Sequence, residues 1–409
     1  MLGIGKIGTA LVKDLCNSEG VSEITAADVD VEQVRRKLEP LNSPKIKVEK
    51  LDAKDMSKLK RTLSGGYDVV ASTLPFALNY NVVKAAIETG VNYTDVNLLH
   101  GNWDKLYRGI PPWDLQKLAL DADVTILPDN GLHPGIVSVL EGAGVGQLDK
   151  VKKIRSYFSG FPQKGTKSYN NPLKYGIQFD WSGAVDSYCA PGGVARPGSS
   201  TTKILRDGQL VEVDVLSGPG NPEIIMFPEP LGEVEAFFVG LPTSIEQLEL
   251  TGIEEGWEKA CRWPGHCQRW KMLRDLHLLD HEPVTINGLK VEPRDVLIAI
   301  GNRYLQFEKG EGDVTVLRIE VEGEKDGQLT QYAYDMLDFY DPIGDVMSMG
   351  RTTGFSCSIA SQMIARGDIE KGFYPPAKIG RDPSLRKKYL DELSKRKIHV
   401  RESVRHMVA

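Results

Sequence analysis

The sequence predicts an α/β protein with two parts: an N-terminal Rossmann domain whose first strand is largely missing, and an α+β substrate domain with a mostly antiparallel sheet. Three observations predict this fold class. A glycine-rich loop opens the chain, strand-like and helix-like segments alternate up to about residue 130, and strand-like segments dominate after that point. Such alternation is typical of a parallel, doubly wound sheet. The length of 409 residues exceeds the ~250–300 residues over which a single core grows, so two domains are expected.

The first motif is the pattern GxGxxG at residues 3–8. In such a loop the backbone approaches a pyrophosphate closely, and the N-terminal amides of the following helix bind the anion. A helical pattern over 9–17 and a short strand ending at Asp28 follow the loop. The loop residues expected to hold a dinucleotide are Gly3, Gly5, Lys6, Ile7 and Gly8.

Asp28 lies 20 residues after Gly8, where an acid can accept hydrogen bonds from the ribose hydroxyls. A carboxylate at this point would repel a 2′-phosphate, so the sequence favours NAD over NADP as cofactor. The alternative is that Asp28 belongs only to a turn at the end of the strand, together with the nearby Asp30.

The segment before the glycine loop is unusually short. Only Met1 and Leu2 precede it, whereas a Rossmann unit places a central strand there. The sequence therefore leads us to expect that the natural start lies upstream of Met1.

Further strands are predicted at 45–51, 67–71, 91–95 and 124–127. Ligands of doubly wound sheets bind beyond the carboxyl ends of the strands. Asp52 is therefore expected beside the adenine ring, and a carboxylate at Asp95 or Asp129 would hold an amino group, act as a base, or simply cap the following loop. The ribose and the nicotinamide are expected to pass Ser72, Thr73, Leu74 and Pro75.

From about Pro134 onward, the alternation of strand-like and helix-like segments gives way to pairs of strand-like runs separated by turn residues. The turn 206–208 separates strand-like runs at 201–205 and 209–215, and a glycine-bounded turn separates 314–321 from 328–336. A further strand is expected at 177–181. This pattern of strands and turns predicts a mostly antiparallel sheet that packs one face against the core.

The order of these motifs resembles that of the saccharopine dehydrogenase family. The resemblance includes Gly-Leu-His-Pro-Gly at 131–135, Arg-Trp-Pro-Gly-His at 262–266 and Met-Gly-Arg-Thr-Thr-Gly-Phe at 349–355. Matches spread over most of the chain are more specific than one glycine loop. The sequence is most similar to lysine 6-dehydrogenase-like and saccharopine dehydrogenase-like members. His133 departs from the small or acidic residue expected in its motif, which leaves the substrate open.

The resemblance implies a particular reaction and domain plan. The reaction would be hydride transfer between a nicotinamide and the carbon of a C–N bond, in a lysine-type amino acid or a saccharopine-like secondary amine. The plan would be a Rossmann domain over 1–133, a catalytic and dimerisation domain like that of glyceraldehyde-phosphate dehydrogenase over 134–350, and a segment over 351–409 that returns to the nucleotide domain and ends in a helical tail.

This chemistry needs a proton acceptor near the amine and cations for the substrate carboxylates. The candidate catalytic residues are His133, His266, Asp95 and Asp129. The candidate substrate-binding residues are Arg262, Arg351, Thr352 and Tyr175. Each has a structural alternative: a salt bridge for the arginines, a buried side chain that orders its loop for His266, and a core position for Tyr175.

Three rival functions remain open. A carboxynorspermidine dehydrogenase-like polyamine enzyme would share the scaffold and differ in the charge of its pocket. An NAD-binding regulatory protein would bind NAD tightly, without turnover and without a loss of rate on changing Arg262 or His266. A thiol-dependent aldehyde dehydrogenase would need Cys189, whose surroundings do not match that active-site pattern.

The composition limits which binding partners and which cellular compartment are expected. The formal net charge of −6 favours neither nucleic acid nor an anionic membrane, and no apolar run reaches the ~18–20 residues of a spanning helix. Five cysteines without a CxxC pair fit a reduced, cytoplasmic setting, and no metal site is expected. A homodimer is expected because an open sheet needs a cover on its exposed face.

Overall fold

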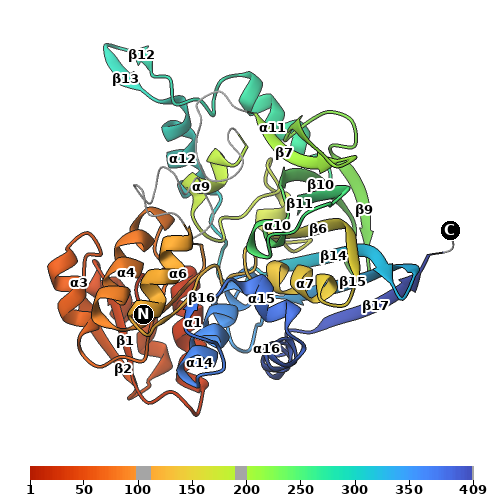
Figure 1. Cartoon of the computed structure of the whole chain (residues 1–409). Coiled ribbons are helices and arrows are strands. Elements are labelled where there is room, and N and C mark those ends of the chain that lie inside the picture. Colours follow the sequence, from red (N-terminus) through yellow and green to blue (C-terminus); the bar gives the residue numbers. More distant parts are fainter. Residues whose placement is uncertain (98–111, 189–199, 408–409) are drawn as a thin grey trace. The chain divides into compact units, whose positions relative to one another are not determined.

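The computed structural model describes residues 1–97, 112–188 and 200–407. The chain forms two compact units, which are described separately (Figure 1). Unit 1 comprises Met1–Ala143 and Met349–His399, and unit 2 comprises Gly144–Ser348 and Val400–Ala409. The sequence had suggested boundaries at 133/134 and 350/351, whereas the compact units change at 143/144, 348/349 and 399/400.

The strands of unit 1 are parallel, as the alternating pattern predicts. One sheet pairs β1 with β2, and the other has the order β16-β5-β4-β3. Their bounds are β1 (Ile24–Asp28), β2 (Ile46–Lys50), β3 (Val69–Ser72), β4 (Asn92–Asp95), β5 (Thr125–Leu127) and β16 (Gly372–Phe373).

The start of the chain lies between the two sheets of unit 1. Leu2 forms parallel bridges with Ala27 on one side and with Ser72 on the other. Its amide donates to the Ala71 carbonyl at 2.9 Å, and the Gly3 amide donates to the Ala27 carbonyl at 3.0 Å. Met1 to Gly3 therefore take the place of the central strand that leads into the glycine loop.

Helices cover these sheets and bury two apolar clusters. One cluster joins Leu11 and Val12 of α1 to Ala26 of β1 and Ala71 of β3, and Cys357 of the returning helix α14 completes it. The segment Met349–His399 is thus part of the same compact unit as the start of the chain. The helices are α1 (Lys6–Asn17), α2 (Val31–Leu38), η1 (Glu39–Leu41), α3 (Met56–Leu63), α4 (Phe76–Thr89), α6 (Pro112–Asp121), α7 (Ile136–Val145), α13 (Ser348–Gly350), η2 (Arg351–Phe355), α14 (Ser356–Ala365), α15 (Pro376–Arg381) and α16 (Pro383–Lys395).

Unit 2 is built on a nine-stranded sheet with the order β17-β15-β14-β6-β11-β10-β9, to which β7 and β8 are attached. Among the described strands of this sheet only the β6–β11 pair is parallel, so the predicted mostly antiparallel sheet is confirmed. The strands are β6 (Lys150–Pro162), β7 (Thr201–Arg206), β8 (Gln209–Asp214), β9 (Glu223–Phe227), β10 (Gly232–Gly240), β11 (Glu255–Arg262), β14 (Asp313–Lys325), β15 (Gln328–Phe339) and β17 (Val400–His406).

Short helices and one small hairpin complete unit 2. They are α8 (Lys167–Asn170), α9 (Trp181–Asp186), α10 (Thr243–Gln247), α11 (His266–Asp275), α12 (Pro293–Tyr304), and the hairpin of β12 (Val284–Ile286) and β13 (Leu289–Val291). No helix among the described residues is long and apolar enough to cross a membrane.

Two local expectations were wrong. Residues 177–180 are irregular rather than a strand, because the Asp180 carboxylate accepts a hydrogen bond from the Ser182 amide and caps α9 there. The C-terminal tail is not helical throughout. Helix α16 ends at Lys395, and β17 then pairs with β15, where it satisfies the backbone of that strand.

Candidate active site

The glycine loop of unit 1 has the geometry of a phosphate cradle. Gly5 is the N-cap of α1, and no side chain caps this helix. A Cβ atom on Gly8 would lie 2.1 Å from the Gly3 carbonyl oxygen, so only glycine fits there. A Cβ atom on Gly5 would meet no protein atom within 4 Å. The loop is therefore tightly closed on the protein side and open above Gly5, which suits the approach of a dinucleotide phosphate.

Side chains from three other segments fix this loop. The Thr73 hydroxyl donates to the Gly3 carbonyl at 2.7 Å. The Asp28 carboxylate accepts hydrogen bonds from the amides of Ile4 (2.7 Å) and Asp30 (3.1 Å). The Lys37 ammonium donates to the Ile4 carbonyl at 2.8 Å. Sequence reasoning missed Lys37, since no spacing rule links a residue of α2 to the loop.

The ends of β3 and β4 are joined by a chain of polar side chains. The buried Ser72 hydroxyl donates to Asn79 at 2.6 Å, and the Asn79 amide donates to Asn97 at 2.9 Å. The Leu74 amide lies 3.4 Å from the Ser72 hydroxyl, and Pro75 is the exposed N-cap of α4. The predicted segment 72–75 thus stands at the carboxyl edge of the sheet. Neither Asn79 nor Asn97 carried a sequence signal.

Asp52 lies in an exposed turn after β2, where its carboxylate accepts a hydrogen bond from the Lys54 amide at 2.9 Å. This contact belongs to the turn itself. A place beside the adenine ring stays a prediction for this residue.

Asp95 and Asp129 lie close together, as their strand-end positions predict. The Asp95 carboxylate is fully buried and accepts hydrogen bonds from the Tyr93 hydroxyl, the Asp129 amide (2.8 Å) and the Asn97 amide (3.0 Å). Asp129 is also buried and has a left-handed backbone with φ of +63°. These contacts are those of a carboxylate that caps a strand-end turn. A catalytic role for either aspartate stays a prediction.

His133 lies half-buried in the loop that leads into α7. Burial lowers the pKa of its imidazole to about 4, against the opposing effect of the Glu141 carboxylate. The side chain is therefore neutral at neutral pH and can take part in hydrogen bonds as an uncharged group.

Arg351 and Thr352 begin the π-helical turn η2, and both are buried. The Arg351 guanidinium donates to the Arg396 carbonyl at 3.1 Å, just after α16, which is a familiar role for arginine at a helix C-terminus. In the same turn, Gly354 allows close packing on α1, since its Cβ atom would lie 2.9 Å from the Ile7 carbonyl oxygen. Substrate binding by Arg351 and Thr352 stays a prediction.

In unit 2 the motif at 262–266 forms the turn from β11 into α11. The Trp263 indole donates to the Pro162 carbonyl at 2.7 Å. Gly265 has a φ of +85° and is the N-cap of α11. The Glu235 carboxylate of β10 accepts hydrogen bonds from the amides of Gly265 (2.7 Å) and Cys267 (2.6 Å). This anchoring places Arg262 and His266 on either side of one rigid turn.

Arg262 is a buried cation that forms no ion pair with any carboxylate in the described ranges. One of its terminal nitrogens donates to the Ser159 hydroxyl and to the Cys261 carbonyl at 2.8 Å. Its Nε atom is buried without a hydrogen-bond partner in the described part of the chain, and no described carboxylate forms an ion pair with it. The guanidinium carbon lies 5.6 Å from the centre of the Tyr175 ring. A buried, uncompensated guanidinium is costly unless an anion joins it, and a carboxylate matches its geometry.

His266 lies in the same aromatic cluster as Arg262. Its Nε2 atom is hydrogen-bonded to the Tyr188 hydroxyl at 2.8 Å, and its ring stacks on Phe237 at 5.6 Å. Burial, reinforced by the positive charge of Arg262, lowers the pKa of His266 well below its usual value. Burial also raises the pKa of Tyr188. Both groups are therefore neutral near neutral pH. Tyr188 carried no sequence signal.

Two family models together match nearly the whole chain. Residues 1–127 match the family model described as saccharopine dehydrogenase NADP binding domain, and residues 131–398 match the one described as saccharopine dehydrogenase C-terminal domain. The chain belongs to the saccharopine dehydrogenase family. It is therefore an oxidoreductase by family, as the resemblance implied.

Two fungal relatives match along nearly the whole chain. Saccharopine dehydrogenase [NADP(+), L-glutamate-forming] of Schizosaccharomyces pombe is 24% identical over 427 residues, which cover 88% of this chain and 89% of that protein. The protein of the same name from Saccharomyces cerevisiae is 22% identical over 432 residues, with 90% and 91% covered.

Solved structures share the fold. Apo saccharopine dehydrogenase (L-Glu forming) from Saccharomyces cerevisiae has a TM-score of 0.77 at 21% identity and covers 100% of this chain and 99% of that chain. Homospermidine synthase from Legionella pneumophila in complex with NAD has a TM-score of 0.59 at 13% identity, with 99% and 90% covered.

The expected preference for NAD over NADP was wrong. The matching N-terminal family model is an NADP binding domain, and the fungal relatives are named for NADP(+). The inference had rested on the charge of Asp28. That carboxylate already accepts hydrogen bonds from the Ile4 and Asp30 amides, so it helps to hold the loop in shape. Its charge alone therefore does not determine whether NAD or NADP is preferred.

Two further expectations concern thiol and metal chemistry. Cys189, the nucleophile of the aldehyde dehydrogenase alternative, lies outside the described residues. Within the described ranges, no group of three or more His, Cys, Asp or Glu side chains is arranged to hold a metal ion.

Proposed function

We propose that this protein is an NADP-linked oxidoreductase that acts on the C–N bond of a saccharopine-like secondary amine. The names of the fungal relatives support both the substrate and the cofactor. The observation that carries the proposal is the buried guanidinium of Arg262, which has no acidic partner among the described residues and suits a substrate carboxylate.

The glycine loop of unit 1 would hold the cofactor. The N-terminal amides of α1 and the open surface above Gly5 would receive the phosphates, and Thr73 and Asp28 would keep the loop in the receiving shape. When bound, the nicotinamide would accept or supply the hydride of the reaction.

Unit 2 would contribute the recognition of the substrate. Arg262 would bind a carboxylate through its planar fork, and the Tyr175 ring would limit the tilt of the guanidinium. His266 and Tyr188 are neutral and hydrogen-bonded to each other, so they would support the site as uncharged groups and not as its base. Of the four predicted catalytic residues, His133 suits the amine best, because a neutral imidazole can accept a hydrogen bond from it.

The substrate is tested by a panel of amines. Nicotinamide absorbance would be followed with saccharopine, L-lysine and carboxynorspermidine, each with NADP and with NAD. Turnover of saccharopine with NADP supports the proposal. Turnover of carboxynorspermidine alone would replace it with a polyamine enzyme, and tight NADPH binding without turnover of any amine would favour a regulatory protein.

A further inference from the structure

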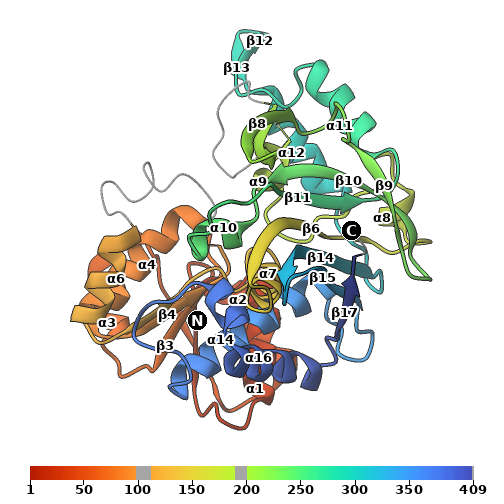
Figure 2. The ribbon, with the colours of Figure 1, turned by 45° about the vertical axis from the view of Figure 1, so that its right-hand side comes forward.

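Ile4 of the glycine loop is held at both of its polar backbone groups. Its amide donates to the Asp28 carboxylate at 2.7 Å, and its carbonyl accepts a hydrogen bond from the Lys37 ammonium at 2.8 Å. Asp28 ends β1 and Lys37 lies on α2, in the red to orange first part of the chain (Figure 2). A residue fixed on both sides by charged groups does not turn without breaking a strong hydrogen bond.

The two anchors of Ile4 are themselves linked by hydrogen bonds. The Asp28 carboxylate accepts from the Asp30 amide at 3.1 Å, and the Asp30 carboxylate accepts from the Gln33 amide at 3.0 Å. The side-chain oxygen of Gln33 accepts from the Lys37 ammonium at 2.7 Å. Together with the two hydrogen bonds of Ile4, these contacts form a closed ring, so the position of the ammonium is fixed relative to the loop.

The direction of the Ile4 carbonyl determines the direction of the next amide. The C=O and N–H groups of a trans peptide point in opposite directions, and the peptide between Ile4 and Gly5 is trans. Because the carbonyl points at Lys37, the Gly5 N–H points to the other side of the loop. No described residue accepts a hydrogen bond from this N–H, and a Cβ atom on Gly5 would meet no protein atom within 4 Å. The loop thus presents a donor to open space, as phosphate binding requires.

We propose that Lys37 is a positioning residue for the cofactor: by holding the Ile4 carbonyl, it directs the Gly5 N–H toward a phosphate group of the bound dinucleotide. Lys37 acts through the backbone and does not touch the cofactor. The inference rests on the proposed binding of the cofactor at the glycine loop. Without Lys37, the peptide between Ile4 and Gly5 is free to turn, and a carbonyl oxygen then replaces the N–H and repels the phosphate.

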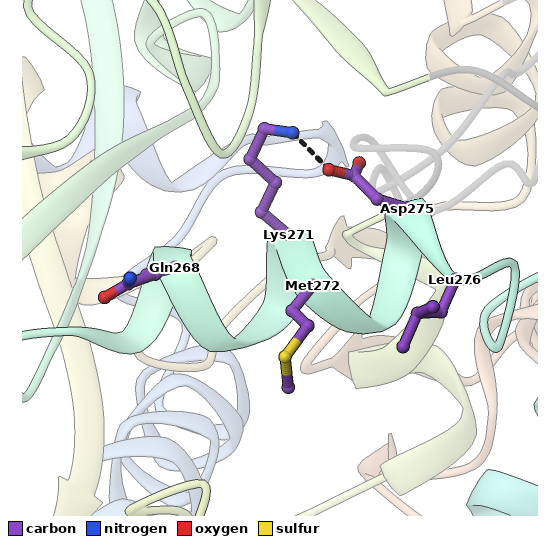
Figure 3. Close-up of a pocket in the computed structure, with 5 residues that line it drawn as sticks. All are labelled: Gln268, Lys271, Met272, Asp275 and Leu276. Atoms are coloured by element: carbon purple, nitrogen blue, oxygen red, sulfur yellow. Dashed lines mark hydrogen bonds and ion pairs between the residues drawn. The ribbon is translucent and has the colours of Figure 1, made fainter.

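Two other lysines provide matched controls. The Lys45 ammonium is also half-buried and also donates to backbone carbonyls, those of Cys16 (3.0 Å) and Ser18 (2.8 Å), at the opposite end of α1. Its removal tests the same kind of contact away from the loop. Lys271 of unit 2 points to Asp275, one turn later on α11 (Figure 3). Its removal tests the loss of a positive charge alone.

The test is a fluorescence titration of the whole chain with NADPH and with NADH, at low and at high salt. Lys37→Met should raise the Kd for NADPH at least about tenfold, because a charge-assisted hydrogen bond of the loop is lost. The factor should be the same for NADH and should not depend on salt, since the backbone and not the ammonium contacts the phosphate. In initial rates with saccharopine, the change should appear in the KM for NADP and not in kcat. Lys45→Met and Lys271→Met should leave the Kd unchanged.

Contrary outcomes separate the role of Lys37 from the proposed function. A wild type that binds no NADPH would overturn both. An unchanged Kd in Lys37→Met would overturn the role of Lys37 alone. The same holds for a loss confined to NADPH or abolished by high salt, because the ammonium would then contact the cofactor directly.

Circular dichroism would show whether each variant is folded. If Lys37→Met does not fold, Gln33→Met replaces it, because this change removes the acceptor that directs the ammonium and affects an exposed residue. It should raise the Kd for NADPH severalfold, and an unchanged Kd would overturn the proposal.

Discussion

The candidate site of unit 1 is formed by backbone groups, whereas that of unit 2 is formed by side chains. In unit 1 the glycine loop offers backbone amides, and Thr73, Asp28 and Lys37 hold that backbone through its own polar groups. In unit 2 the Arg262 site consists of buried side chains from several elements, with a cation that has neutral hydrogen-bond partners but no acidic partner among the described residues. The first site is thus satisfied within the protein, whereas the second has a binding capacity that its own residues do not use.

The largest effect on the glycine loop is expected for Gly8→Ala. The new methyl group would overlap the Gly3 carbonyl oxygen at 2.1 Å, so the loop must open. We expect a loss of at least about 100-fold in NADPH affinity and a fall of about 3 kcal/mol in the free energy of unfolding. Fluorescence titration with NADPH and urea unfolding would measure the two effects.

Gly5→Ala is the matched control for that experiment. Its methyl group meets no protein atom within 4 Å, so the free energy of unfolding should change by less than about 0.5 kcal/mol. NADPH affinity should still fall, because the methyl group stands where a phosphate approaches. Equal unfolding costs for the two variants would contradict the described shape of the loop.

The pH dependence of stability tests burial of the histidines in both units. The folded-state pKa of His133 is lowered to about 4, below the ~6.5 of an unfolded histidine, and that of His266 is lowered as well. The unfolded chain therefore binds protons first as the pH falls. The stabilisation by His133 is complete above pH ~6.5 and is lost as the pH falls toward about 4, by up to ~1.4 kcal/mol per pH unit. His266 contributes in the same direction.

His133→Gln should reduce this slope, as measured by unfolding in urea between pH 7 and pH ~4.5. His277→Gln is the control, since the His277 side chain is 80% exposed. An unchanged slope for His133→Gln would mean that this imidazole titrates normally in the folded protein.

Arg262→Met distinguishes a ligand-binding cation from a structural one. Breaking a buried ion pair costs ~3–5 kcal/mol, because the partner charge is stranded. Arg262 has no such partner among the described carboxylates, so the substitution removes hydrogen bonds to neutral groups, among them Ser159, the Cys261 carbonyl and the Tyr188 hydroxyl. We expect the free energy of unfolding to fall by no more than about 1 kcal/mol, measured by urea titration. A fall of several kcal/mol would assign the guanidinium to the framework.

The smallest effect is expected for Thr73→Val, which removes the hydroxyl that donates to the Gly3 carbonyl. One neutral hydrogen bond is worth about 1 kcal/mol, so NADPH affinity should fall only severalfold. Thr89→Val, which changes a hydroxyl bonded to the Ala85 carbonyl within α4, should leave that affinity unchanged. An unchanged affinity for Thr73→Val would remove this residue from the set that holds the loop.

The fold and the glycine loop were predictable because their signals are local. Alternating hydrophobicity identified the strands, and the GxGxxG spacing located the loop. The Arg262 cluster could not be predicted from the spacing of residues in the sequence. Tyr188 reaches His266 across 78 residues, and no period in the sequence connects them. Arg351 had the expected motif, yet its guanidinium contacts the chain just after α16, a tertiary contact that the motif does not encode.

The predicted preference for NAD over NADP was wrong for a related reason. The spacing of Asp28 was correct for a strand-end acid, but spacing does not reveal that the Ile4 amide already binds its carboxylate. Burial and hydrogen-bond partners, which only the folded chain defines, separate a ligand-binding side chain from a structural one.

The central claim is that Arg262 binds a substrate carboxylate in an NADP-linked amine oxidoreductase. Its most direct test compares initial rates of the wild type and Arg262→Met with saccharopine and NADP, alongside NADPH titration of both. We expect turnover by the wild type, a KM for saccharopine raised at least about 100-fold in the variant, and an unchanged Kd for NADPH. A variant that keeps the KM of the wild type would contradict the claim.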